Sequence, residues 1–194
     1  MSDDDKLKFV WWKLLLMALI PLALIMGAFI FGVRQVGADG YHRLVSFISE
    51  NYFGLGSVFL FVYLVDTFIV PLTGDLIFPL VVGMKWYIVV PLIGFASFLG
   101  GVSGYLLGNL CSKIPVVNRL TDKIIAKWGA YLDKYGIVVI ILSTLTPIPF
   151  STVAWASGIF KYSKRKAFPA FLLRFVRMGL YFVLFRAGLS TALL

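Results

Sequence analysis

Four ionisable side chains stand inside strongly apolar stretches of this chain, and they are the residues best suited to do chemistry. Two are the carboxylates of Asp66 and Asp75, and two are the guanidinium groups of Arg174 and Arg177. An ionisable group at membrane depth is costly to keep there and usually has a function. These four residues are therefore the first candidates for a functional site.

The two aspartates are candidates for proton coupling. Asp66 and Asp75 flank a break in an apolar stretch, and a carboxylate that is poorly solvated binds a proton more readily than one in water. Asp75 can instead cap the helical arm that follows it, because an aspartate accepts hydrogen bonds from the start of a helix.

The two arginines are candidates for contact with a lipid phosphate. Arg174 and Arg177 have i, i+3 spacing and share a helix face, and a guanidinium offers a planar fork of donors that suits phosphate or carboxylate. Two other arrangements stay open, because the side chains can extend to the headgroups or pair with the aspartates. Arg186, near the far end of the same stretch, is expected to extend to the headgroups.

The segment TLTPIPFST places hydroxyl side chains around two prolines. Thr144, Thr146 and Ser151 surround Pro147 and Pro149. With free backbone donors at a chain break, these hydroxyls can form a cradle for an anion or a lipid headgroup. Alternatively, they only satisfy the broken backbone.

The composition indicates a membrane protein. The 194 residues are 60% hydrophobic and 14% charged, whereas about a quarter of a soluble domain is charged. The net charge is +9, and the basic residues lie beside apolar runs, which favours membrane lipids and an anionic membrane surface over nucleic acid as partner. Cys111 and His42 are the only residues of their types, which excludes a disulfide framework and a His/Cys metal cluster. No common catalytic motif is present, so neither an enzyme nor a cofactor is expected.

Three apolar runs are long enough to span a bilayer, at 14–33, 89–110 and 168–189, since about 20 residues cross its hydrocarbon core. For the first run, a cleaved signal peptide is the competing interpretation, and we favour a retained helix. We expect an all-α polytopic membrane protein, with an N-terminal helix and interfacial segment in 1–52 and the main membrane unit in 53–194.

The remaining apolar segments are broken at Pro71 and Gly74 and again at Pro147 and Pro149. Proline breaks a helix, and lipid does not tolerate the freed backbone groups unless protein or a polar cavity covers them. Each broken segment is therefore predicted to be a re-entrant hairpin. The arms are 55–65 and a second one to Gly83 in the first hairpin, and 137–142 and a second one to Gly158 in the other.

The two hairpins belong to an apparent internal repeat, 53–112 and 136–190, joined by a basic amphipathic linker over 113–135. Repeated broken segments in corresponding halves indicate a midplane site in a transporter; the alternative is a chance resemblance of apolar stretches. The linker is either a helix on the membrane surface or an ordinary solvated connection. Charge placement puts the N-terminus and the linker in the cytoplasm, so the hairpins enter from opposite faces.

Gly100, Gly104 and Gly108 recur on one face of the middle span. Small residues at this spacing form a smooth groove for a neighbouring helix. The face can serve packing within the chain or a homo-oligomer.

The order of these motifs resembles the DedA family, which shares the VTT (SNARE-associated Golgi protein) domain. The segments that carry the resemblance are DTFIVPLTGDLIFPLVVG from 66, GGVSGYLLG from 100, YGIVVIILSTLTPIPFSTVAWASG from 135 and RFVRMGLYF from 174. The resemblance implies a multi-pass protein of the bacterial inner membrane with two opposed re-entrant hairpins. It also implies acidic functional residues at Asp66 and Asp75.

The resemblance further implies lipid movement between leaflets: flipping or scrambling of phospholipids, or recycling of undecaprenyl phosphate, in some members driven by the proton-motive force. The chain departs from the family where two hairpin arginines are expected, because Thr144 and Phe150 stand there. Arg174 and Arg177 are expected to supply the missing charge. Two other classes remain open: an ion- or proton-coupled small-solute transporter or channel, and a non-transporting membrane scaffold.

Overall fold

The computed structural model describes residues 52–69, 74–146 and 149–193, together with single positions between 27 and 46. Within these ranges every element is helical and no strand occurs, which confirms the all-α expectation for this part of the chain. The elements are α2 (Tyr52–Thr67), η1 (Gly74–Ile77), α3 (Phe78–Val81), α4 (Trp86–Cys111), α5 (Pro115–Leu145), α6 (Phe150–Ile159), α7 (Lys164–Phe171) and α8 (Leu173–Leu193). The first predicted span, 14–33, lies outside the continuous ranges, and Pro71 and Pro147 lie outside the described residues.

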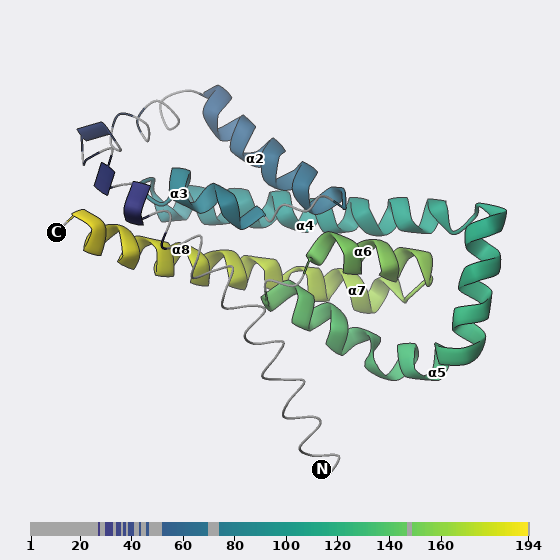
Figure 1. Ribbon diagram of the computed structural model, residues 1–194. Helices are drawn as coiled ribbons and strands as arrows, with labels where there is room; N and C mark the ends of the chain where they lie inside the picture. Colours follow the sequence, from purple (N-terminus) through teal and green to yellow (C-terminus); the bar gives the residue numbers. More distant parts are fainter. Residues whose placement is uncertain are drawn as a thin grey trace, which may run out of the picture.

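Two stretches are long and apolar enough to cross a membrane, namely Trp86–Cys111 and Lys164–Ser190. They contain the predicted spans 89–110 and 168–189, and the 26 residues of α4 extend about 39 Å. The second stretch is interrupted at Leu172, whose N–H bonds to the carbonyl of Pro169 at 3.2 Å, a tighter turn than an α-helix makes. Figure 1 shows α4 running along the molecule, with α8 beside its first half.

Two separate hydrophobic cores lie along these helices. The first joins α2, η1 and α3 to the beginning of α4 and the later turns of α8, and includes Val62, Phe78, Ile93, Met178 and Phe185. The second joins the later turns of α4 to α5, α6 and α7, and includes Tyr105, Ile140, Phe150, Ala154 and Phe171. In Figure 1, α2 accordingly lies against one half of α4 and α6 against the other, while α3 contacts η1 and α8.

The glycine face of α4 is filled by helices of the same chain. A Cβ atom on Gly100 would lie 2.8 Å from the Cβ of Asp66, and one on Gly108 would lie 2.2 Å from the carbonyl oxygen of Trp155. Gly104 faces the Trp155 ring and the carbonyl of Thr67. Since α2 and α6 pack on this face, a homo-oligomer formed through it would have to displace them.

The predicted linker 113–135 and the arm after it are one continuous helix, α5. Figure 1 shows α5 leaving the end of α4, bending, and returning toward the middle of the molecule. Gly136, expected to begin a new unit, instead lies inside this helix, where the Tyr162 ring would be 2.8 Å from an added Cβ. An isolated glycine is tolerated within a helix when packing holds it there.

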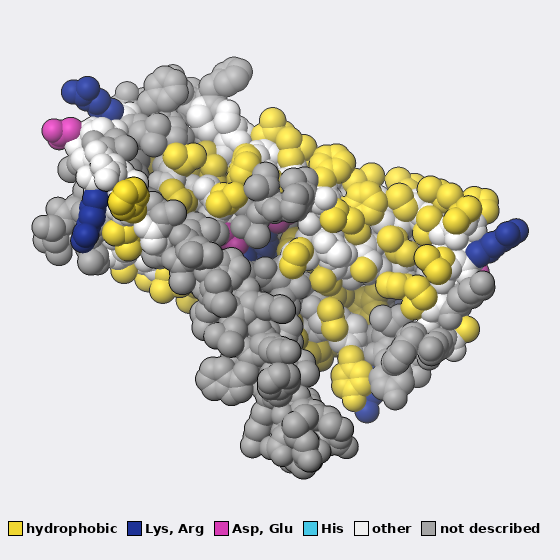
Figure 2. Space-filling model, viewed as in Figure 1, with side chains coloured by type: hydrophobic (Ala, Val, Ile, Leu, Met, Phe, Trp, Pro, Cys, Tyr) yellow, Lys and Arg dark blue, Asp and Glu magenta, His cyan; other side chains and the backbone are white. Residues whose placement is uncertain are grey.

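The surface separates apolar from basic side chains. Figure 2 shows hydrophobic side chains over the middle of the visible face and Lys and Arg at its two ends. Exposed lysines flank α4 at both ends, Lys85 and Lys113, while Leu106 and Val183 are 44% and 66% exposed along the candidate spans. This distribution and the two candidate spans suggest association with a membrane.

Candidate functional site

A layer of buried polar side chains separates the two cores. It consists of Asp66 at the end of α2, Asp75 in η1, Ser97 in α4, and Arg174 and Arg177 at the start of α8; we call these five residues the charged layer. Each is at most 4% exposed. In the chain the two arginines lie between Phe171, at the end of α7 in the second core, and Met178 and Tyr181 of α8 in the first core. In Figure 2 acidic and basic atoms are visible in the middle of the apolar face.

The first ion pair of the layer joins Asp66 to Arg174. Ser97 completes it, because Arg174 Nε donates to Ser97 Oγ at 2.5 Å and Ser97 Oγ donates to Asp66 Oδ2 at 2.5 Å. Gly100, one turn beyond Ser97, lets Asp66 approach α4 this closely. The first pair is thus a closed ring of three side chains from three helices.

The second ion pair joins Asp75 to Arg177. Arg177 also donates through Nη1 to the carbonyl of Thr146, at the end of α5. One guanidinium therefore holds the start of η1 and the end of α5 together.

The second pair is incompletely bonded. Asp75 Oδ1 and Arg177 Nε are both buried and have no hydrogen-bond partner among the described residues. A buried polar atom without a partner costs roughly 1–3 kcal/mol, so proteins keep few of them without a reason. The second pair carries one free acceptor and one free donor at the centre of the molecule.

Aromatic rings cover both guanidinium groups. Arg174 Cζ lies 4.5 Å from the centre of the Phe150 ring, and Arg177 Cζ lies 4.9 Å from that of Tyr181. A guanidinium over an aromatic face is attracted by the ring quadrupole, more strongly where water is excluded. Together with the two carboxylates, which make the layer net neutral, the rings lower the cost of burying two cations.

The end of α2 is tied to α6 next to the layer. Trp155 Nε1 donates to the carbonyl of Thr67 at 2.7 Å, and this carbonyl belongs to the last turn of α2, where helical partners run out. Thr67 Oγ1 is a further buried atom without a partner among the described residues. The indole thus links segments that belong to the two different cores.

The threonine hydroxyls of the predicted cradle bond to carbonyls of their own helix. Thr144 Oγ1 donates to the carbonyl of Ile141 at 2.7 Å, and Thr146 Oγ1 donates to that of Leu142 at 2.6 Å. These bonds satisfy the helix end, as the alternative interpretation had it, and Thr146 joins the charged layer through its main-chain carbonyl. Ser151 is buried in the first turn of α6, and Pro149 precedes that helix.

The structure brings together the four ionisable residues that the sequence singled out, in the paired arrangement that was one of the alternatives for the arginines. Sequence reasoning missed Ser97, Phe150 as a partner of Arg174, and Trp155. A lone serine within the apolar run GFASFL was the only signal for Ser97. No group of three potential metal ligands occurs in the described part of the chain.

Comparison with known proteins adds one relative. An archaeal protein of Methanocaldococcus jannaschii, called "Uncharacterized protein MJ0201", is 29% identical over 102 residues, which are 52% of this chain and 64% of the relative. The match thus spans less than two thirds of the relative's length. No family model matches the chain, and no solved structure does.

Proposed function

We propose that this protein moves a phosphate-bearing lipid between the leaflets of a membrane, with the headgroup passing through the charged layer. The observation that carries the proposal is the second pair. Asp75 and Arg177 are buried at mid-length of an apolar helix assembly, and each keeps a polar atom that no described residue bonds to. An ionisable group in such a place is expensive unless it has a function.

In the proposed arrangement α4 and the α7–α8 stretch cross the membrane. The segment from α2 to α3 forms one re-entrant hairpin, and the later part of α5 with α6 forms the other, entering from the opposite face. Broken backbone at membrane depth needs polar partners, and the bonds from Trp155 to Thr67 and from Arg177 to Thr146 provide them. The resemblance to the DedA family supports the same placement in an inner membrane, multi-pass and with the N-terminus in the cytoplasm.

Arg177 is the proposed phosphate ligand. A phosphate offers the guanidinium the same bidentate bonding as a carboxylate, so an arriving headgroup competes with Asp75 and with the Thr146 carbonyl for Arg177. Occupation would release the end of α5 and free the Asp75 carboxylate to accept a proton. Loss of that proton to water and return of the Asp75 carboxylate to Arg177 would then expel the phosphate.

Arg174 has a positioning role in this scheme, because Ser97 and Asp66 already accept hydrogen bonds from its Nε and Nη2. Its guanidinium nevertheless lies over Phe150, and Phe150 and Thr144 stand where the resemblance leads us to expect arginines. This supports the idea that α8 supplies the charge that the hairpin lacks.

The test is transbilayer movement of a fluorescent phosphate-bearing lipid in liposomes containing the purified protein. We expect wild type to expose inner-leaflet label to a membrane-impermeant quencher, and the double variant Asp75→Ala with Arg177→Ala to fall to the rate of empty liposomes. Arg165→Ala, which removes an exposed cation of α7, is the matched control and should keep the wild-type rate. Equal rates for wild type and the double variant would overturn the proposal.

A proton- or ion-coupled small-solute transporter is the second candidate, since a buried carboxylate with a free oxygen also suits a proton. Proton flux into sealed vesicles without lipid movement would favour it over the lipid transporter.

A further inference from the structure

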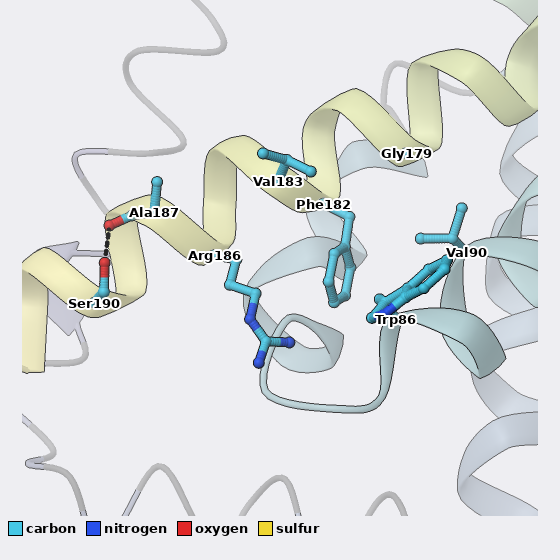
Figure 3. A pocket seen from close by; sticks show the side chains of 8 residues that line it. All are labelled: Trp86, Val90, Gly179, Phe182, Val183, Arg186, Ala187 and Ser190. Atoms are coloured by element: carbon cyan, nitrogen blue, oxygen red, sulfur yellow. Dashed lines mark hydrogen bonds between the residues drawn. The ribbon is translucent and has the colours of Figure 1, made fainter.

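A groove of about 710 Å³ lies between the first turns of α4 and the later turns of α8, away from the charged layer. Trp86 and Val90 form one wall, and Gly179, Phe182, Val183 and Arg186 form much of the other. Figure 3 shows Phe182 and Arg186 extending from α8 on the side where Trp86 lies. The hydroxyl of Ser190, at the edge of the groove, donates to the Ala187 carbonyl, so Arg186 is the charged group of an otherwise apolar groove.

We propose that this groove binds one anionic phospholipid, with the phosphate on Arg186 and an acyl chain lying toward Gly179. The inference rests on the membrane placement proposed above and is independent of transport. Its first support is charge. Arg186 is exposed, its Cζ lies 5.9 Å from the Phe182 ring, and it forms no ion pair with a described carboxylate. An arginine of this kind suits a lipid phosphate.

The second support is depth. Trp86 is 61% exposed and follows the exposed Lys85 at the start of α4, and Trp and Lys at the end of a span mark the headgroup level. Arg186 shares the groove with Trp86 and so lies near that level. From Arg186 to Gly179 the groove follows α8 for about 10 Å toward the middle of the molecule, which is the direction of an acyl chain below its headgroup.

The third support is the space at Gly179. A Cβ atom added there would meet only Val90 Cγ1, at 3.9 Å. A larger side chain at 179 can therefore enter the groove without disturbing the backbone, and it is a suitable plug.

The experiment is native mass spectrometry of the full chain in detergent, titrated with phosphatidylglycerol or with phosphatidylcholine of the same acyl chains. At equal lipid concentrations, wild type should bind one more molecule of phosphatidylglycerol than of phosphatidylcholine. Arg186→Ala should weaken that binding about fivefold, Arg186→Lys should keep it, and Gly179→Leu should reduce it. Gly56→Leu, at an exposed helical glycine with nothing within 4 Å, is the matched control and should bind like wild type.

Equal binding of the two lipids by wild type, or unchanged binding by Arg186→Ala, would overturn the inference. A cross-linking experiment gives a further test: Cys111→Ser removes the native cysteine, Val183→Cys places one in the groove, and single cysteines are placed in 14–33. Disulfides that form between these positions regardless of added lipid would also overturn the inference, because the chain itself would then fill the groove. The test distinguishes this inference from the proposed function, because Asp75→Ala should lose lipid movement between leaflets and keep the preference for binding phosphatidylglycerol.

Discussion

The two ion pairs of the charged layer use the same residue types and are equally buried, yet their surroundings differ. Ser97 closes the first pair, Asp66–Arg174, by bonding to both partners. The second pair, Asp75–Arg177, leaves Oδ1 and Nε without partners among the described residues, and Arg177 also bonds to the Thr146 carbonyl. We call Asp66–Arg174 the closed pair and Asp75–Arg177 the open pair. The closed pair holds three helices together and serves stability, whereas the open pair can exchange partners and suits a function.

The largest expected effect is on stability, from breaking the closed pair. Arg174→Ala leaves Asp66 as a buried charge without its cation and exposes Ser97 and Phe150 to an unfilled space. We expect the free energy of unfolding to fall by about 3–5 kcal/mol, measured by reversible denaturant titration in detergent micelles with helix content as the signal.

Replacing both members of the first pair is the control for that loss. Asp66→Leu with Arg174→Met removes both charges and fills similar volume, so the double variant should return to within about 1 kcal/mol of wild type. A double variant as unstable as Arg174→Ala would mean that the pair is not what the single substitution disrupts.

Breaking the open pair should cost less stability. Arg177→Ala also leaves the Asp75 carboxylate without its cation, but it removes at the same time the buried Nε that has no partner among the described residues. We expect a loss of about 1–3 kcal/mol in the same titration. A loss larger than that of Arg174→Ala would reverse the assignment of closed and open pairs.

Gly100→Ala should disturb the first pair by pushing Asp66 and α2 away from α4. The added Cβ would lie 2.8 Å from the Cβ of Asp66 and 2.9 Å from the Tyr63 carbonyl oxygen, so α2 must shift, at a cost of about 1–3 kcal/mol. Gly179→Ala is the matched control and should stabilise α8 by about 0.5–1 kcal/mol, because its Cβ has room and alanine favours helix. Equal stabilities of the two variants would show that α2 does not pack as described.

The smallest expected loss of stability comes from opening the closed pair. Ser97→Ala leaves Arg174 Nε without its acceptor and makes the first pair resemble the second. We expect a loss of about 1–2 kcal/mol, and thermal unfolding in micelles is sensitive enough to resolve it. A neutral substitution would indicate that Ser97 does not link the pair.

The sequence predicted much of the helical framework and the key residues of the site. The helix expected at 89–110 occurs as Trp86–Cys111, because a long apolar run between lysines has few alternatives. Asp66, Asp75, Arg174 and Arg177 stood out as charges in apolar surroundings.

What the sequence did not determine depends on contacts between distant segments. Asp66 pairs with Arg174 and Asp75 with Arg177 because α4 places Ser97 beside the first pair, and no local pattern encodes that choice. At Gly136, where α5 continues, the Tyr162 ring packs so closely that an added Cβ would lie 2.8 Å from it. The break at Leu172 follows Pro169 within a run that hydropathy alone describes as one span.

The central claim, that the open pair handles phosphate and the closed pair holds structure, is tested most directly by comparing lipid movement in Arg177→Lys and Ser97→Ala liposomes. Lysine keeps the charge but lacks the guanidinium fork, so Arg177→Lys should slow movement about tenfold, as loss of one charge-assisted bond would. Ser97→Ala should stay within about twofold of wild type, since the expected loss there is in folding stability. Unimpaired movement in Arg177→Lys together with loss of movement in folded Ser97→Ala would contradict the account.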